Sequence, residues 1–213
     1  MNEAAASGGV IWACHADGQA VAGHIATAIE QRGARLLAVP GGNTPLAIFD
    51  ILSVMDLPWG ELSLMLTDDR IVAKDHDASN FGKLTKAFAG TKAKLIDLVE
   101  GSVPPRADLV WIGMGTDGHI ASLFPTMKAP VQVDENSALI VRTVPDPLPP
   151  EAPFERLSLN RSALVDTNEL IIVARGADKK AILEQAIREE HDLPIAQLIK
   201  AASCPITIFW SET

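Results

Sequence analysis

The sequence contains few cysteines and has a deficit of positive charge. Cys14 and Cys204 lie far apart and lack the short spacing of metal-ligand motifs, so we expect a reducing, cytoplasmic location. The chain has 18 lysines and arginines against 27 aspartates and glutamates, a formal net charge of −9. This negative balance argues against nucleic acid or an anionic membrane as a partner. It does not exclude a small anionic ligand, which needs only a few local cations.

The sequence also lacks long apolar runs, targeting segments and repeats. No run approaches the roughly 18 apolar residues of a membrane span. The N-terminus has no basic segment followed by an apolar stretch, so we expect no signal peptide. The one proline-rich stretch, Pro145–Pro153, is interpreted as a loop, because a strand-like pattern resumes directly after it. With 213 residues, 47% of them hydrophobic, we expect a single domain over residues 1–213.

Short apolar runs alternate with helical patterns along the chain. Val21, Ile25 and Ile29 recur at a spacing of four, which predicts one face of a helix; further helices are expected from Thr44 to about Leu52 and around Ala181–Ala186. The runs expected as strands are Val10–Ala13, Leu36–Val39, Leu62–Leu66, Leu109–Ile112, Ala138–Val141, Leu170–Ala174 and Ile206–Trp210. Such continuous runs suit strands that are buried on both faces. The pattern predicts an α/β fold, with a mostly parallel sheet covered by helices on both faces.

The first loop of chemical interest is Gly41–Pro45, between an expected strand and an expected helix. Thr44 is a good N-cap residue, and Pro45 suits the first helical position. The two glycines let a ligand approach the backbone, and the helix N-terminus offers free N–H groups to an anion. Phosphate binding is one interpretation of this loop. An ordinary capped turn is the other.

A second loop, Thr67–Arg70, follows another expected strand, and Ser79-Asn80 comes some ten residues later. Charged side chains at the carboxyl end of a strand lie where open α/β sheets bind ligands. A solvated loop with a local ion pair is the alternative. Because Asp68 and Asp69 are adjacent on an extended backbone, we expect their side chains to point apart rather than to form a carboxylate pair.

The third loop, Gly113–His119, directly follows an expected strand and matches the dinucleotide-binding pattern G-x-G-x-x-G. Pro125 follows the last of these glycines after only six residues, which leaves no room for the long helix of a βαβ unit. The glycines instead predict a close-packed loop that presents Asp117 and His119. His119 is then either a general base or a hydrogen-bonded structural histidine.

Taken together, these loops resemble those of the 6-phosphogluconolactonases and their relatives, the glucosamine-6-phosphate deaminases. The segments that carry the resemblance are Gly41–Pro45, Asp68–Arg70 with Ser79-Asn80, Gly113–Pro125, Arg156–Leu159 and Gly176–Lys179. They span nearly the whole chain, and the Gly113–Pro125 block is the most specific. The resemblance implies a Rossmann-like, NagB-type fold. It also implies a carboxylic ester hydrolase that acts in the oxidative pentose phosphate pathway, converting 6-phospho-D-glucono-1,5-lactone to 6-phospho-D-gluconate without metal or organic cofactor.

The resemblance also assigns roles to individual residues. His119 would deprotonate the attacking water and later protonate the departing ring oxygen, Asp117 would orient the imidazole, and Arg70 or backbone N–H groups would stabilise the oxyanion. The residues expected to bind substrate are Gly41, Gly42, Asn43, Thr44, Asp68, Asn80, Arg156 and Lys179. The phosphate would lie on the Gly41–Thr44 loop and be held by Arg156 and Lys179.

The sequence departs from the family pattern at three positions. Asp69 replaces the usual glutamate, Asn43 the usual serine of the phosphate loop, and Ile120 the usual threonine of the lactonases. Ile120 is more typical of the deaminases. In those enzymes, however, a stretch resembling Phe-Asn-Glu-Pro follows the histidine, whereas Ser122–Pro125 contains no carboxylate. This difference favours the lactonase.

Three other functions remain open at this point. A sugar-phosphate deaminase or isomerase would share the fold and the phosphate site, and a non-catalytic sugar-phosphate sensor would need no base. A nicotinamide-dependent oxidoreductase is supported only by the glycine pattern. We expect a small sugar-phosphate lactone as the partner of a monomer or small homo-oligomer.

Overall fold

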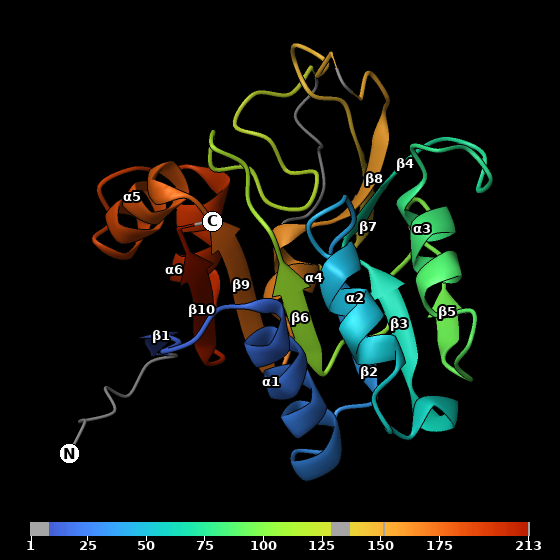
Figure 1. The fold of residues 1–213 in the computed structure, drawn as a ribbon. Coiled ribbons are helices and arrows are strands. Elements are labelled where there is room, and N and C mark those ends of the chain that lie inside the picture. The colour runs from blue at the N-terminus through green and yellow to red at the C-terminus, as the bar shows by residue number, and fades with distance from the viewer. Residues whose placement is uncertain (1–8, 129–136, 151, 213) are drawn as a thin grey trace.

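A seven-stranded parallel sheet forms the centre of the computed structural model, which describes residues 9–128, 137–150 and 152–212 (Figure 1). Its strand order is β1-β10-β9-β6-β2-β3-β5. The strands are β1 (Val10–Trp12), β2 (Leu36–Val39), β3 (Ser63–Leu66), β5 (Lys94–Ile96), β6 (Leu109–Ile112), β9 (Glu169–Arg175) and β10 (Ile206–Ser211). Every pairing between neighbours is parallel, which confirms the predicted sheet.

Helices cover both faces of this sheet. The helices are α1 (Gly18–Gln31), α2 (Leu46–Ser53), α3 (Asn80–Ala87), α4 (Arg161–Val165), α5 (Ala177–Ile187) and α6 (Pro194–Ala201), with a short 3₁₀ turn, η1, at Trp59–Glu61. Helices α1, α2 and α3 pack in series, and α4, α5 and α6 form a second group. Crossovers between parallel strands are right-handed almost without exception, so connections that advance to opposite sides of β2 place their helices on opposite faces. No helix in the described ranges is long and apolar enough to cross a bilayer.

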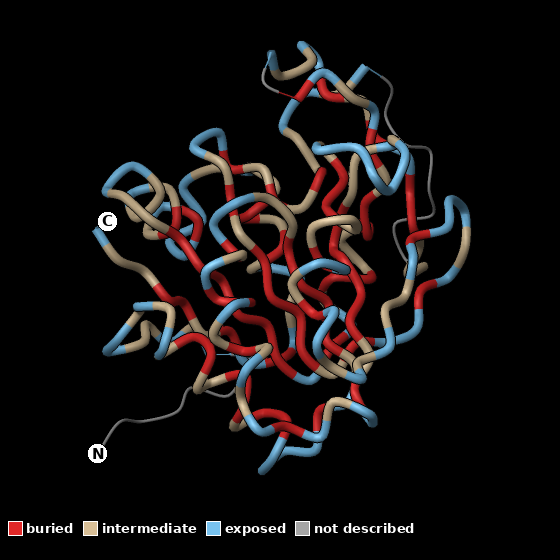
Figure 2. Tube along the Cα trace, turned by 45° about the vertical axis from the view of Figure 1, so that its right-hand side comes forward, coloured by how far each residue is buried: buried red, intermediate tan, exposed pale blue. Residues whose placement is uncertain are grey.

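The core lies between the sheet and its helices (Figure 2). Helix α1 buries Val21, Ile25 and Ile29, the face predicted from their spacing. In β6 all four residues are buried, and the Trp111 ring packs edge-on against Phe49 of α2 at 5.5 Å. A central strand packed on both faces exposes neither set of alternating side chains, which explains its continuous apolar run.

A second, three-stranded antiparallel sheet corrects two predictions. Its order is β4 (Asp68–Arg70), β8 (Arg156–Leu159) and β7 (Ile140–Thr143). The Asp68–Arg70 part of the predicted second loop is therefore a strand, which lies opposite Arg156–Ser158. The run expected at Ala138–Val141 as part of the parallel sheet instead begins at Ile140 and belongs to this small sheet. Local sequence does not reveal which sheet an apolar run joins, because pairing partners are distant in the chain.

The strand order reverses beside β2. Strands β3 and β5 follow β2 on one side, whereas β6, β9 and β10 continue on the other. A crevice opens at the carboxyl ends of the strands where the order reverses, and open α/β sheets bind ligands there. The loop after β2 begins at Pro40 and the loop after β6 at Gly113, so both predicted glycine loops reach this point.

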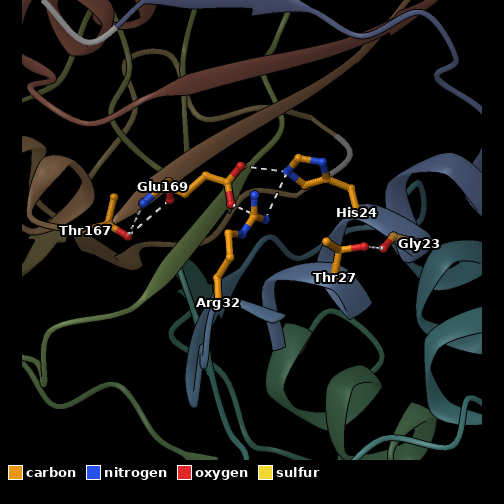
Figure 3. A network of polar contacts seen from close by, with 6 residues as sticks. All are labelled: Gly23, His24, Thr27, Arg32, Thr167 and Glu169. Atoms are coloured by element: carbon orange, nitrogen blue, oxygen red, sulfur yellow. Dashed lines mark hydrogen bonds and ion pairs between the residues drawn. The ribbon is translucent and has the colours of Figure 1, made fainter. Parts of the chain in front are cut away.

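At the opposite end of the sheet, a charged network joins α1 to β9 (Figure 3). Glu169, the first residue of β9, accepts a hydrogen bond from His24 Nε2 at 2.6 Å and pairs with Arg32 Nη2 at 2.7 Å. Its side chain is only 12% exposed. The network thus binds the helix to the start of a central strand, away from the crevice.

We predict that Glu169→Gln lowers the free energy of unfolding by about 1.5–3 kcal/mol, because a buried charged acceptor loses its charge while Arg32 keeps its own. Urea denaturation measures this change. Glu61→Gln is the control, since Glu61 is exposed and pairs with Arg35 at 3.2 Å; it should change stability by no more than about 0.5 kcal/mol. Equal losses in the two variants would contradict the prediction.

Candidate active site

A cleft of about 220 Å³ lies at the reversal of strand order. It is lined by Pro40, Gly41, Gly42, Asn43, Thr44, Pro45, Asp68, Arg70, Asn80, Trp111, Gly113, Met114, His119, Ala121, Arg156, Val173, Arg175 and Lys179. Every residue predicted from the sequence to bind substrate lies in this lining, and so do His119 and Arg70. Asp117 does not line the cleft, but it contacts His119. The structure thus gathers all three predicted loops at one place.

The charge of the cleft is opposite to that of the chain. Its lining contains four cationic side chains, Arg70, Arg156, Arg175 and Lys179, and one carboxylate, Asp68. The whole chain carries a net charge of −9. This local concentration of cations suits an anionic ligand.

The Gly41–Pro45 loop differs in detail from its prediction. Helix α2 begins at Leu46, and no side chain caps it, so Thr44 is not its N-cap. Instead the Asn43 carbonyl accepts the Leu46 N–H at 3.2 Å, which forms a turn ahead of the helix. Within the described ranges the backbone N–H groups of Asn43 and Thr44 have no acceptor, so they are available to a ligand in the cleft.

The Asn80 side chain joins the first two loops. Its Oδ1 accepts hydrogen bonds from Gly42 N at 3.1 Å and Arg70 Nη1 at 2.9 Å, and its Nδ2 donates to the Asp68 carbonyl at 3.3 Å. A Cβ on Gly41 would overlap this amide, so only glycine leaves room for it. The Gly42 N–H group is therefore already bonded to Asn80. The expected contact of Gly42 with the ligand does not involve this N–H group.

Asp68 and Asp69 point apart, as predicted. Asp68 Oδ2 accepts the Ser122 hydroxyl at 2.6 Å, which ties β4 to the histidine loop. Asp69 accepts the backbone N–H groups of Asn80 at 2.7 Å and Phe81 at 3.0 Å, at the start of α3. Burial raises the pKa of Asp69, and these N–H groups offset part of that rise. Asp69 thus anchors α3 and lies outside the cleft.

His119 and Asp117 form a close pair, with 2.6 Å between Nδ1 and Oδ1. Burial alone would raise the pKa of Asp117, but the His119 backbone N–H and the ring outweigh it, so the pKa is lowered. Because an ionised carboxylate only accepts, Nδ1 is the donor of this pair, and in the neutral form of the ring the lone pair then lies on Nε2.

Two glycines of the predicted loop are required by the packing around this pair. A Cβ on Gly115 would overlap both His119 Nδ1 and Asp117 Oδ1. Gly118 has φ +79, and a Cβ there would lie 2.8 Å from Leu193. No helix follows within Gly113–Lys128, consistent with the early proline. The glycines therefore serve the packing of the histidine loop, not the pyrophosphate cradle that their spacing suggests.

Sequence reasoning missed Arg175. It is the last residue of β9, and its Nη1 donates to the Ala16 carbonyl at 2.6 Å and to Ser211 Oγ at 2.8 Å. The available signal was a cation directly after the apolar run Leu170–Ala174, since the carboxyl ends of central parallel strands form ligand sites. Lys179 lies nearby, in the first turn of α5, and burial lowers its pKa.

No group of three or more His, Cys, Asp or Glu side chains in the described part of the chain is arranged to hold a metal ion. The expected absence of a metal or organic cofactor stays a prediction.

Comparison with known proteins places this chain in a family. The family of glucosamine-6-phosphate isomerases and 6-phosphogluconolactonases matches residues 13–210. The chain belongs to this family. A 6-phosphogluconolactonase of Neisseria meningitidis is 33% identical over 218 residues, which cover 91% of this chain and 92% of that protein. The crystal structure of a 6-phosphogluconolactonase from Shewanella baltica superposes with a TM-score of 0.77 at 27% identity, covering 95% of this chain and 97% of that one.

The fold alone does not separate the two branches of the family. The solved structure of a monomeric glucosamine-6-phosphate deaminase superposes with a TM-score of 0.75 and covers 95% of this chain and 97% of its own. Its sequence identity is only 14%, so this likeness concerns the backbone arrangement. The choice of reaction must therefore come from the side chains of the cleft.

We predict that Gly115→Ala separates the imidazole of His119 from the Asp117 carboxylate beyond hydrogen-bonding distance, because the added methyl group needs the space of both. Overpacking of this kind costs about 1–3 kcal/mol of stability. A crystal structure measures the separation, and urea denaturation the stability. Gly90→Ala is the matched control, since no atom lies within 4 Å of its added Cβ. An intact 2.6 Å contact in Gly115→Ala would contradict the prediction.

Proposed function

We propose that this chain hydrolyses 6-phospho-D-glucono-1,5-lactone to 6-phospho-D-gluconate, the second step of the oxidative pentose phosphate pathway. The observation that carries the proposal is the His119–Asp117 pair in a cleft with four cationic side chains. The pair supplies a base, and the cations suit a phosphate. Family membership and relatives named 6-phosphogluconolactonase support the same reaction.

In the proposed mechanism His119 Nε2 takes a proton from a water molecule, and the water oxygen attacks the lactone carbonyl. Asp117 holds the ring through Nδ1 and stabilises the imidazolium that forms. When the tetrahedral intermediate collapses, the bond from the carbonyl carbon to the ring oxygen breaks. The imidazolium then returns its proton to that oxygen, which leaves a hydroxyl and a carboxylic acid.

Arg70 is proposed to act near the phosphate loop. Its Nη1 donates to the Asn80 side chain at 2.9 Å and to the Ala78 carbonyl at 2.9 Å, and Asn80 in turn holds Gly42. These bonds support a position beside the Gly41–Thr44 loop. Stabilisation of the oxyanion by Arg70 stays a prediction; such a donor is typically worth about 3 kcal/mol.

The phosphate is proposed to lie between the free N–H groups of Asn43 and Thr44 and the cations Arg156, Arg175 and Lys179. Arg156 is only 6% exposed, and burial lowers the pKa of Lys179. A bound phosphate would give both groups charge-assisted hydrogen bonds, which are strongest where water is excluded.

We predict that His119→Ala reduces kcat for the lactone by about 10²–10⁴, the range for a lost general acid–base. Its folding should be nearly intact, since the side chain is 30% exposed. Stopped-flow measurement of acid release, corrected for spontaneous hydrolysis, gives the rate. His15→Ala is the control, because His15 is exposed and outside the cleft. A kcat near that of wild type would remove His119 from the mechanism.

Arg156→Ala and Lys179→Ala should each raise KM for the phosphorylated lactone by about ten- to a hundredfold, because each removes a charge-assisted contact worth roughly 1.5–3 kcal/mol. Turnover of unphosphorylated gluconolactone should change little. Lys180→Ala is the control: Lys180 lies over the Trp210 ring at 4.5 Å and does not line the cleft. Equal losses on both lactones would show that Arg156 and Lys179 support the fold instead.

A paired assay tests the function itself. We expect the purified protein to hydrolyse fresh 6-phosphogluconolactone and to release no ammonia from glucosamine 6-phosphate, because Ser122–Pro125 supplies no second carboxylate for proton transfer between carbons. Stoichiometric release of ammonia and fructose 6-phosphate, at a rate rivalling lactone hydrolysis, would replace the lactonase with the deaminase. No turnover of either substrate would favour a sugar-phosphate sensor.

A further inference from the structure

Phe124, in the loop after β6, contacts both the proposed base, His119, and one of the proposed phosphate-binding cations, Arg156. Its ring stacks on the imidazole of His119, with centroids 4.4 Å apart and an interplanar angle of 28°. The guanidinium carbon of Arg156 lies 5.0 Å from the centroid of the same ring. Phe124 does not line the cleft, so it touches the two residues without taking the place of the ligand.

The stacked geometry distinguishes this ring from the others. Within the described ranges the remaining aromatic pairs are tilted or edge-on, including those of His24 with Phe209 at 72° and His76 with Phe154 at 77°. Among the described residues, His119 and Phe124 form the one pair whose rings are stacked. A stacked neighbour restricts the plane of the imidazole, whereas an edge-on contact leaves that plane less defined.

Asp117 and Phe124 restrain different motions of His119. The 2.6 Å contact with Asp117 fixes the position of Nδ1, yet the ring can still rotate about that contact. Stacking on Phe124 removes this rotation and therefore fixes the direction of Nε2. A ring face also attracts a cation, so the same contact stabilises the imidazolium formed during turnover.

Arg156 uses the same ring as a support. Its guanidinium is buried, and Nη2 donates to the Ala152 carbonyl at 3.2 Å. The cation–π contact with Phe124 gives the guanidinium a further restraint. A residue between β6 and β7 thereby aligns a cation of β8 with the histidine of its own loop.

We propose that Phe124 is a positioning residue that sets the placement of His119 relative to Arg156, and hence of the base relative to the substrate's phosphate. The inference rests on the proposed function for its kinetic consequences. Its geometric content is independent of turnover, because the two contacts exist whatever the reaction is.

The placement is tested first by NMR of the histidine ring protons, with His119→Gln used to identify the signals of His119. Phe124→Leu keeps an apolar side chain but removes the ring, and Phe124→Tyr keeps the ring. We expect the ring-current upfield shift of the His119 signals to disappear in Phe124→Leu and to persist in Phe124→Tyr. Unchanged His119 signals in Phe124→Leu would overturn the placement, even if the protein hydrolyses no lactone.

Kinetics then test the positioning role. In Phe124→Leu we expect kcat to fall about two- to tenfold on both phosphorylated and plain gluconolactone, through His119. We expect KM to rise by a similar factor on the phosphorylated lactone alone, through Arg156. Phe124→Tyr should restore both values.

Phe209→Leu is the matched control, because Phe209 also touches a histidine but lies in β10 outside the cleft. It should lower thermal stability and leave both kinetic constants unchanged. Wild-type constants in Phe124→Leu, equal losses in Phe124→Tyr, or a parallel loss in Phe209→Leu would each overturn the positioning role. A wild-type protein that turns over neither lactone would refute the proposed function, while the NMR result would still decide the placement of His119.

Discussion

The parallel pairing of β2 with β3 on one side and β6 on the other is the constraint on which the site depends. Parallel strands end at the same edge of a sheet, so the loops that follow these three strands must meet there. The segment after β2 brings N–H groups, the segment after β3 brings Asp68 and Arg70 of β4, and the loop after β6 brings His119. Residues as distant in the chain as Pro40 and Lys179 thereby form one cleft without any local sequence signal that links them directly.

Within this cleft, small residues decide which contacts are possible. Gly41 makes room for the Asn80 amide, and Gly115 makes room for the His119–Asp117 pair. Neither glycine contributes a side chain to chemistry, yet each determines where a functional side chain lies. The glycine pattern of the third loop therefore reflects dense packing around a polar pair, which a spacing rule for dinucleotide sites does not distinguish.

The charge distribution follows from the same geometry. The acidic residues, which outnumber the lysines and arginines by 27 to 18, lie mostly outside the cleft, whereas cations from β4, β8, β9 and α5 converge on it. These elements belong to two different sheets and a helix. Their convergence produces a local positive field in a chain with a net charge of −9, which is the condition for drawing in an anionic substrate.

The sequence by itself determined the parallel α/β sheet, because central strands must be continuously apolar, and it identified the loops that supply the cleft. The resemblance of Gly113–Pro125 and its companion segments to a known family added Arg156 and Lys179. Only the tertiary structure decided the antiparallel sheet of β4, β8 and β7, the use of Gly42 N–H by Asn80, the place of Arg175 and the stacking of Phe124 on His119. The physical reason is that apolar periodicity is a local property of the chain, whereas strand partners and side-chain contacts join residues that are distant in sequence and depend on how the whole core packs.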